Sequence, residues 1–387
     1  MNGWKYVKIG DVCTVERGGS PRPIEKYITD DPSGINWIKI GDTTDSMYIT
    51  DTAQKIIPEG TKKSRYVQPG DFLLSNSMSF GRPYILKIDG CIHDGWLVLR
   101  DNSNLFDKRF LYYYLSSPST YQKFKNMAVG GVVNNLNSEM VRGVTVPVPK
   151  MEEQTEIVET LDHVGDLISL RKQQLAKLDE LVKARFVELF GDCKDQTTIK
   201  ESGLTISDGN YSNKYPRSDE FVDNGVSFIR ANNMKDGTIT DEDMYFITPA
   251  KHQILLKGHL KPNDVLITTR GNIGQVAIVP PKYNDSNINA QIVLLRDENG
   301  RFIPQFLLWA LQTEEVKMQC LKFQTGTALK QLPVGQLEQI VIKEPTLTAQ
   351  EQFATFVKQT DKSKLSIQQS LNKLEILKKS LMQKYFG

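Results

Sequence analysis

Three matched pairs of polar, glycine-containing segments hold the residues of this 387-residue chain that are best suited to binding chemistry. In the first half they are residues 17–22, 75–82 and 130–135, and in the second half residues 208–214, 268–275 and 326–331. Arginine can donate two hydrogen bonds to guanine, asparagine and glutamine can pair with adenine, and serine or threonine can bond to bases or phosphates. Glycine lets a backbone approach phosphates closely. These residue types together predict contacts to a nucleic acid.

The candidate nucleic-acid-binding residues come from these six segments. They are Arg17, Arg22, Asn76, Ser77, Ser79, Arg82, Asn134, Asn210, Tyr211, Lys214, Thr269, Arg270, Asn272, Gln275 and Lys330. Taken singly, each could equally belong to an ordinary solvated turn. The matching favours binding, because Gly81 stands opposite Gly274 while Arg82 stands opposite Gln275 and Ser77 opposite Arg270. We therefore expect a shared scaffold whose contact residues differ.

The matched segments belong to an internal repeat. Residues 110–115 match 306–311, and Phe190-Gly191 matches Phe386-Gly387, all with an offset of 196 positions. A duplication of this kind predicts two copies of one structural unit. Because Gly387 matches a glycine that stands just before the second copy, the repeat is cyclic, and the C-terminus is expected to return near the N-terminus.

Two segments between and after the copies show the alternating four- and three-residue spacing of a coiled coil. The apolar seam positions are Ile157, Leu161, Ile168, Leu175, Leu178, Val182 and Leu189 in the first segment and Phe353, Val357, Ile367, Leu371, Leu374 and Leu381 in the second. The second segment alone would be marginal, since three of its ten seam positions are polar.

The two helices are expected to pair with each other. Residues 151–191 carry 5 basic and 9 acidic side chains, whereas residues 346–387 carry 7 and 3, so the net charges are −4 and +4. An antiparallel pairing follows because a whole copy lies between them, and the stretch from 157 to 189 would span about 50 Å as a helix. The alternative is that each helix packs only on its own domain.

The expected fold class is α/β (α+β), with two similar globular domains joined by two long antiparallel coiled-coil helices. The predicted boundaries are 1–150 and 192–345 for the domains and 151–191 and 346–387 for the helices. Short β-branched runs at 71–74 and 264–267 predict strands, and residues 108–128 and 303–323 predict helical stretches.

The sequence lacks the motifs of the enzyme classes considered. Its four histidines form no His-x-x-x-His pair, and neither a phosphate-binding Gly-Lys-Ser/Thr loop nor a Gly-x-Gly cofactor motif after a strand is present. Residues 279–282 lack the flanking residues that an adenine methyltransferase uses. The four cysteines are widely spaced, and no apolar run could span a bilayer. We therefore predict a cytoplasmic binding protein with no catalytic site and no metal.

The two variable copies, the paired helices and the Phe-Gly helix ends resemble the specificity subunit of type I restriction–modification enzymes along the whole chain. The most specific matches are Pro149, Glu153-Gln154 and Phe190-Gly191, with Gln350 and Phe386-Gly387 in the second copy. Ala349 stands where the family pattern has glutamate, which weakens the motif.

The resemblance implies that each copy is a target recognition domain for one half of a split double-stranded DNA site. It also implies that the helices dock two methyltransferase subunits, through which restriction subunits attach. S-adenosylmethionine, ATP and magnesium are then expected on those partners only. Two alternatives stay open: the recognition module of a split fused methyltransferase–nuclease, and a scaffold that binds proteins rather than DNA.

Overall fold

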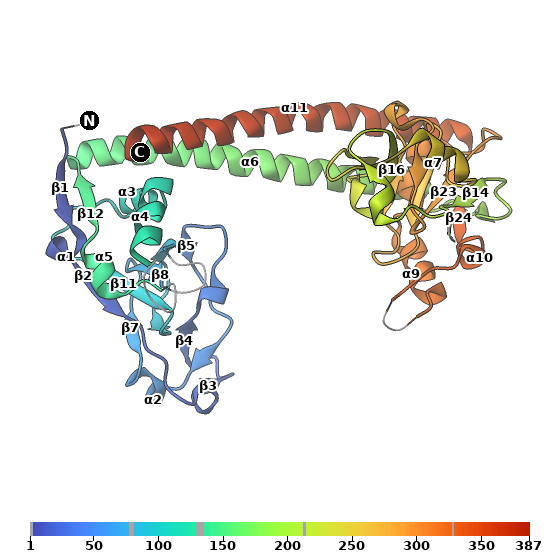
Figure 1. Ribbon diagram of the computed structural model, residues 1–387. Helices are drawn as coiled ribbons and strands as arrows, with labels where there is room; N and C mark the ends of the chain where they lie inside the picture. Colours follow the sequence, from blue (N-terminus) through green and yellow to red (C-terminus); the bar gives the residue numbers. More distant parts are fainter. Residues whose placement is uncertain (1–2, 77–80, 129–134, 212–213, 327–328) are drawn as a thin grey trace. The chain divides into compact units, whose positions relative to one another are not determined.

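The computed structural model describes residues 3–76, 81–128, 135–211, 214–326 and 329–387. The chain forms two compact units (Figure 1). Unit 1 comprises Met1–Lys172 and Gln369–Gly387, and unit 2 comprises Gln173–Gln368. Each unit therefore contains one globular copy together with part of each long helix. No helix in the described part of the chain is long and apolar enough to cross a membrane.

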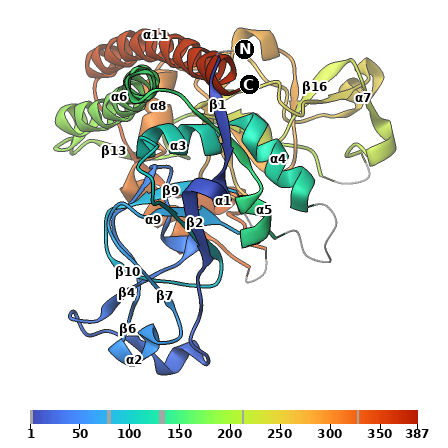
Figure 2. The ribbon, with the colours of Figure 1, turned by 90° about the vertical axis from the view of Figure 1, so that its left-hand side faces the viewer.

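Unit 1 is built mainly from two five-stranded sheets, with strand orders β3-β6-β4-β10-β7 and β2-β11-β8-β9-β5, and a separate β1–β12 pair. Its strands are β1 (Lys5–Lys8), β2 (Cys13–Arg17), β3 (Ile28–Thr29), β4 (Ile35–Ile38), β5 (Tyr48–Ile49), β6 (Lys55–Ile56), β7 (Arg65–Val67), β8 (Phe72–Ser75), β9 (Pro83–Leu86), β10 (Gly90–Ile92), β11 (Trp96–Asp101) and β12 (Thr145–Val148). Its short helices are α1 (Ile9–Val12), α2 (Pro58–Thr61), α3 (Lys108–Leu115), α4 (Pro118–Ala128) and α5 (Ser138–Arg142). Figure 2 shows α3, α4 and α5 in this unit.

Unit 2 repeats much of this plan with smaller sheets, in the orders β14-β23-β20-β21 and β15-β19-β16-β22, and with the pairs β13–β24 and β17–β18. Its strands are β13 (Gln196–Thr198), β14 (Thr205–Asp208), β15 (Phe221–Val222), β16 (Val226–Ile229), β17 (Met234–Lys235), β18 (Thr238–Ile239), β19 (Tyr245–Ile247), β20 (Val265–Thr268), β21 (Val276–Ile278), β22 (Asn287–Ile288), β23 (Ile292–Arg296) and β24 (Val341–Lys343). Its short helices are α7 (Pro249–Ile254), α8 (Pro304–Ala310), α9 (Glu314–Phe323) and α10 (Val334–Leu337).

The two units share the register of their central strands. β11 pairs antiparallel with β2 and β8, and β23 pairs in the same way with β14 and β20. In unit 1 the guanidinium of Arg100 on β11 donates hydrogen bonds of 3.0 and 2.8 Å to the Asp71 carboxylate. Arg296 on β23 grips Asp264 through two contacts of 2.7 Å. These bidentate pairs hold the turn before β8 against β11 in unit 1 and the turn before β20 against β23 in unit 2.

Each helical stretch predicted after the central strands is divided into two helices. Residues 108–128 form α3 and α4, and residues 303–323 contain α8 and α9. In unit 1 the break precedes Pro118, because the residue before a proline disfavours helical geometry. In unit 2 the Thr313 side chain accepts a hydrogen bond from the Val316 N–H and so begins α9.

The two long helices are α6 (Met151–Phe190) and α11 (Leu347–Phe386), each of 40 residues. Unit 1 contains the start of α6 and the end of α11, whereas unit 2 contains the end of α6 and the start of α11, so the helices are antiparallel (Figure 1). Every apolar seam position named above is buried or half-buried. Lys172 pairs with Glu375 at 3.8 Å in unit 1, and Lys364 pairs with Asp179 at 2.5 Å in unit 2.

The helix ends complete the cores of the two units. In unit 1, Phe386 at the end of α11 lies 5.5 Å from Phe110, ring centre to ring centre, in a cluster that also includes Trp4. The C-terminus therefore packs beside the N-terminal strand region, as the cyclic repeat predicts (Figure 2). In unit 2, Phe190 at the end of α6 lies 4.9 Å from Phe306. In both units, therefore, the phenylalanine at the end of a long helix packs on the equivalent phenylalanine of the globular copy.

A fully buried glutamine fastens the start of each long helix to its own globular copy. The Gln154 carbonyl oxygen accepts from the Asp107 N–H at 2.9 Å, and its amide donates to the carbonyl oxygens of Leu105 and Pro149. Gln350 accepts from the Ile303 N–H at 2.8 Å in the same manner. Because buried polar groups need partners, these bonds fix the direction in which each helix leaves its copy.

Candidate nucleic-acid interface

The structure brings the described residues of the first two predicted loops of unit 1 together at the start of β11. The Gly18 N–H donates to the Trp96 carbonyl oxygen at 2.9 Å, which joins the loop of residues 17–22 to this strand. The Asn76 N–H donates to the Gly95 oxygen at 2.9 Å, and the Leu136 N–H donates to the Asn76 oxygen at 3.0 Å. Residues 17–22 and 75–76 therefore meet at residues 92–96, and Leu136 joins them through Asn76.

Unit 2 makes the same three connections. The Gly209 N–H donates to the Ile292 oxygen at 3.4 Å, and the Thr269 N–H donates to the Gln291 oxygen at 2.8 Å. The Leu332 N–H then donates to the Thr269 oxygen at 2.8 Å. Each copy therefore has one cluster of loops, which we call the loop cluster, formed by residues 17–22, 75–76 and 92–95 in unit 1 and by residues 208–211, 268–275, 288–291 and 329–331 in unit 2.

A glycine is required where the first loop passes over the segment before the central strand. A Cβ atom added to Gly18 would lie 2.2 Å from the His93 oxygen, and one added to Gly209 would lie 2.3 Å from the Asn289 oxygen. The neighbouring atom is backbone in both cases and cannot rotate away. The two copies therefore use the same close approach to hold loops of different sequence.

Asp94 is the centre of the unit 1 loop cluster. Its carboxylate accepts from the Ser20 hydroxyl at 2.8 Å and from the Arg22 guanidinium at 3.3 Å. Its carbonyl oxygen accepts from the Arg17 guanidinium at 3.0 Å and from the Asn76 amide at 2.9 Å. Burial acts to raise the pKa of Asp94, but the Ser20 hydrogen bond and the nearby Arg22 charge outweigh it, so the pKa lies below its usual value.

Two predicted arginines of unit 1 are therefore positioned while still facing solvent. The side chain of Arg22 is 81% exposed, and Arg17 is also exposed. A cavity of about 640 Å³ beside them is lined by Trp37, Lys39 and His93 as well as by Asp94. Because Glu25 also lines it, the cavity combines aromatic, basic and acidic side chains and can offer both donors and acceptors to a planar, polar ligand.

The unit 2 loop cluster is organised by an arginine stacked on a tyrosine. The guanidinium carbon of Arg270 lies 4.6 Å from the centre of the Tyr211 ring. The Tyr211 hydroxyl donates to the Ala290 carbonyl oxygen at 2.7 Å. Burial raises the pKa of Tyr211 although the Arg270 charge acts in the opposite direction, so the hydroxyl stays a neutral donor. The stack orients the guanidinium in advance of any ligand.

Several predicted residues have buried or half-buried side chains that bond to the scaffold. Asn210 donates to the Lys257 oxygen at 2.7 Å and accepts from the Leu256 N–H at 3.2 Å. Thr269 is 3% exposed. The Gln275 amide donates to the Met234 carbonyl oxygen. Like Asn76 in unit 1, these side chains hold the loops in place, which leaves the exposed residues for ligand contact.

The remaining predicted residues lie at the surface or outside the described residues. Asn272, Lys214 and Lys330 are exposed, and the Lys330 carbonyl oxygen accepts from the Gly271 N–H at 3.3 Å, which joins two loops of unit 2. Arg82 is exposed beside Asp45 and Tyr84 instead of at Asp94. Ser77, Ser79 and Asn134 fall outside the residues that the structure describes.

The sequence interpretation missed the segment on which the loops converge. Asp94 and Ala290 occupy the same position in the two copies, offset by 196 residues, and each accepts a hydrogen bond from the loop around position 20 or 211. The internal repeat could have indicated this segment, because Ile92 and Ile288 match at the same offset of 196 residues. Nothing in a linear pattern, however, indicates that Asp94, which stands before a buried strand, contacts two separate loops.

Comparison with a protein family supplies an independent result. The model for "Type I restriction modification DNA specificity domain" matches residues 1–180 and 210–376. The chain is 22% identical to the type I restriction enzyme MjaVIII specificity subunit of Methanocaldococcus jannaschii, over 98% of this chain and 91% of that protein. It is 20% identical to the EcoBI specificity subunit of Escherichia coli, over 100% and 86% of the two chains.

Solved structures share the fold. A chain from a type I R-M system, studied for its complex assembly and conformational transition, matches with a TM-score of 0.66 and 18% identity, over 100% of this chain and 98% of that one. The type I restriction-modification S subunit from M. genitalium matches with a TM-score of 0.57 and 14% identity, over 100% and 97%. Both matches show that those chains share this chain's fold of helices and strands.

Proposed function

This chain belongs to the type I restriction–modification DNA specificity family, and we propose that it selects the DNA target of such a complex by binding a site made of two separate parts. The two loop clusters would each bind one part in double-stranded DNA. The observation that carries the proposal is the assembly of matched but differently composed loops at the same position of both copies.

The chemistry of the exposed loop residues supports DNA binding. The half-buried Arg270 guanidinium lies over the Tyr211 ring, and arginine commonly donates two hydrogen bonds to the O6 and N7 of guanine. Arg22, Lys214 and Lys330 are exposed and basic, which suits phosphate contacts. Since the first copy has Ser20 and Asp94 where the second has Tyr211 and Ala290, the two clusters would select different bases.

Methylation and cleavage would be carried out by partner subunits. The long helices offer a suitable docking surface, because Leu181 on α6 and Leu377 on α11 match at the repeat offset and are 49% and 45% exposed. Further exposed apolar residues lie on the same helices, namely Val187 on α6 and Ile376 on α11, and apolar surface that gathers into a patch is typical of protein interfaces. One methyltransferase subunit would bind at each of these equivalent positions, and restriction subunits would attach through them. S-adenosylmethionine, ATP and magnesium would then be bound by the partners.

The test is to sequence the DNA methylated by the purified chain alone, by the methyltransferase subunits alone and by the reconstituted complex. We expect methylation by the complex only, at a single motif with two specified parts and a fixed unspecified gap. Methyl transfer by the chain alone would contradict the division of labour. A reconstituted complex that methylates one continuous motif would contradict the two-part target.

A further inference from the structure

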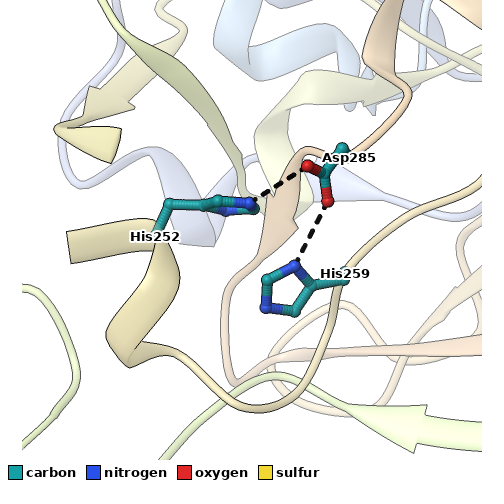
Figure 3. A group of neighbouring side chains, drawn as sticks. All are labelled: His252, His259 and Asp285. Carbon is teal, nitrogen blue, oxygen red and sulfur yellow. Dashed lines mark hydrogen bonds and ion pairs between the residues drawn. The ribbon is translucent and has the colours of Figure 1, made fainter. Parts of the chain in front are cut away.

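Three side chains of unit 2 with metal-binding chemistry lie together next to the loop cluster but outside its residues (Figure 3). His252 is on α7, His259 follows that helix, and Asp285 precedes β22. Their potential ligand atoms all lie within 4.8 Å of one another. The His252 Nε2 and the His259 Nδ1 are each 3.3 Å from an oxygen of the Asp285 carboxylate. The sequence interpretation expected no metal, because the two histidines are seven positions apart rather than four.

The other nitrogen of each imidazole bonds to a protein oxygen. The His259 Nε2 lies 2.5 Å from the Leu255 carbonyl oxygen, and the His252 Nδ1 contacts the Asn287 side-chain oxygen. A carbonyl oxygen can only accept, so the His259 Nε2 carries the hydrogen. In a neutral imidazole the Nδ1 lone pair then points at a carboxylate, which is unfavourable unless a cation lies between them. Histidines that bind metals commonly donate their second N–H to a carbonyl in this way.

At the equivalent position of the first copy a tyrosine hydroxyl faces the carboxylate. Tyr66 pairs with Cys91 across two strands just as His259 pairs with Asn287. There the Tyr66 hydroxyl donates to Asp89 at 2.5 Å, and Asp89 matches Asp285 at the offset of 196 residues. In unit 1 a hydroxyl group donates a hydrogen bond to Asp89, whereas in unit 2 two imidazole nitrogens lie beside the equivalent carboxylate of Asp285. The difference marks a property of the second copy alone.

We propose that His252, His259 and Asp285 bind a divalent transition metal of the zinc class. Two imidazoles and one carboxylate are ligands that Zn²⁺ prefers, at bond lengths of about 2.0–2.2 Å. For a tetrahedral ion with such bonds the edge between two ligand atoms is roughly 3.3–3.5 Å, and each imidazole nitrogen lies 3.3 Å from a different oxygen of Asp285, so a small turn of the carboxylate would let one oxygen bind the ion beside both imidazoles. The Asp285 side chain is 69% exposed, so an ion can enter from solvent and keep a water as its fourth ligand.

The ion would stabilise the unit 2 loop cluster by fixing the segment that supports Asn210. His252 and His259 bracket the segment whose Leu256 N–H and Lys257 oxygen hold the Asn210 side chain. Fixing both histidines to Asp285 would therefore limit the motion of the loop that carries Tyr211. The role of the ion is structural, and no reaction step is assigned to it.

The test measures Zn²⁺ and Co²⁺ binding to the full chain, purified with chelator and without an added histidine tag. At pH 7.5 we expect one Zn²⁺ per chain by titration calorimetry. Co²⁺ should give the visible absorption of a four-coordinate site. Asp285→Asn keeps a residue that tolerates the φ of +58° at this position, and it should weaken Zn²⁺ binding at least about tenfold.

His259→Gln is the second ligand variant and should have the same effect. His163→Asn, which removes an exposed histidine of α6, should bind Zn²⁺ like the unaltered chain. The proposal is overturned if the unaltered chain takes up no stoichiometric Zn²⁺, which would leave protonated imidazoles as the partners of Asp285. It is also overturned if both ligand variants bind Zn²⁺ as well as His163→Asn does.

Discussion

The Arg270 guanidinium rests on the ring of Tyr211 at 4.6 Å, and the Tyr211 hydroxyl is in turn fixed by the carbonyl oxygen of Ala290. One loop therefore orients the side chain that another loop supplies, with the segment before β23 as the support. An arginine held in this way loses little side-chain entropy on binding, so its contact can distinguish one base from another.

Replacing this arginine is expected to relax the target at one base pair. Arg270→Ala should cost about 1–3 kcal/mol of binding free energy on the preferred DNA and affect the second half-site only. Arg270→Lys is the matched control, because it keeps the charge but cannot donate bidentately, and it should relax the same base pair. Lys214→Ala should instead weaken binding to all sequences alike, as a phosphate contact would. The methylated motif and equilibrium binding of the reconstituted complex provide the measurement, and an unchanged motif in Arg270→Ala argues against this contact.

Adding a methyl group to Gly18 or Gly209 should reduce selectivity for one DNA half-site and leave the other unchanged. Gly209→Ala would place a Cβ 2.3 Å from backbone in unit 2, and Gly18→Ala would place one 2.2 Å from backbone in unit 1. Relieving such overlap costs about 1–3 kcal/mol and should displace the loop. Gly335→Ala and Gly41→Ala are matched controls, since an added Cβ meets nothing within 4 Å at either position.

The measurement for the glycine variants is the methylated motif together with the unfolding midpoint. Gly209→Ala should lose selectivity in the second half-site, and Gly18→Ala in the first. If either variant alters both halves equally, the loop clusters do not act independently.

Charged substitutions on the long helices should remove methyltransferase subunits one at a time. Leu181→Asp and Leu377→Asp each place a carboxylate on an exposed apolar position, and each should leave one partner bound instead of two. Leu256→Asp is the control, because Leu256 is 74% exposed but lies off the helices. The mass of the reconstituted complex reports the result. Two partners on both helix variants would place the docking surface elsewhere.

The helix pair is expected to set the gap between the two half-sites. Inserting seven residues after Lys172 in α6 and seven after Gln368 in α11 keeps the seam in phase and lengthens each helix by about 10 Å. The unspecified gap should then grow by up to about 3 base pairs while both half-site sequences stay the same. Inserting two residues instead should destabilise the pair. A folded, active complex with an unchanged gap would exclude this role for the helices.

A half-buried lysine in the seam should limit stability. Burial lowers the pKa of Lys378, whose ammonium lies over Gly165, although Asp162 acts in the opposite direction. Lys378→Met should therefore raise the free energy of unfolding, by up to about 1 kcal/mol at neutral pH. Asp162 keeps its partners Arg109 and Tyr113, both at 2.6 Å.

The sign of the pH dependence follows from the lowered pKa of Lys378. Between its folded value and the usual value of about 10.4, the unfolded chain binds more protons, so this group makes stability rise with pH in that window. Lys378→Met should remove this rise. The exposed neighbour variant Lys379→Met serves as control, and equal unfolding curves for the two variants would argue against a buried charge.

The sequence by itself determined the repeat, the long helices and the positions of their seam. These features are local and periodic: the heptad pattern from Ile157 to Leu189 predicts the 40-residue α6, and its named apolar seam residues are buried or half-buried. The fold class followed from the same observations, because an internal offset of 196 residues requires two similar units. The family resemblance rested on these features too.

Only the tertiary structure decided what each loop residue does. Asn76 and Asn210 are as polar as Arg270 in the sequence, yet strand register places their side chains inside, where they hold neighbouring backbone. Asp94 had no local pattern, because its contacts come from segments 18 to 77 positions away. Likewise His252 and Asp285 meet only because β22 lies beside the segment after α7. Contacts of this kind depend on how distant strands pair, and the spacing of residue types along the chain carries no record of that pairing.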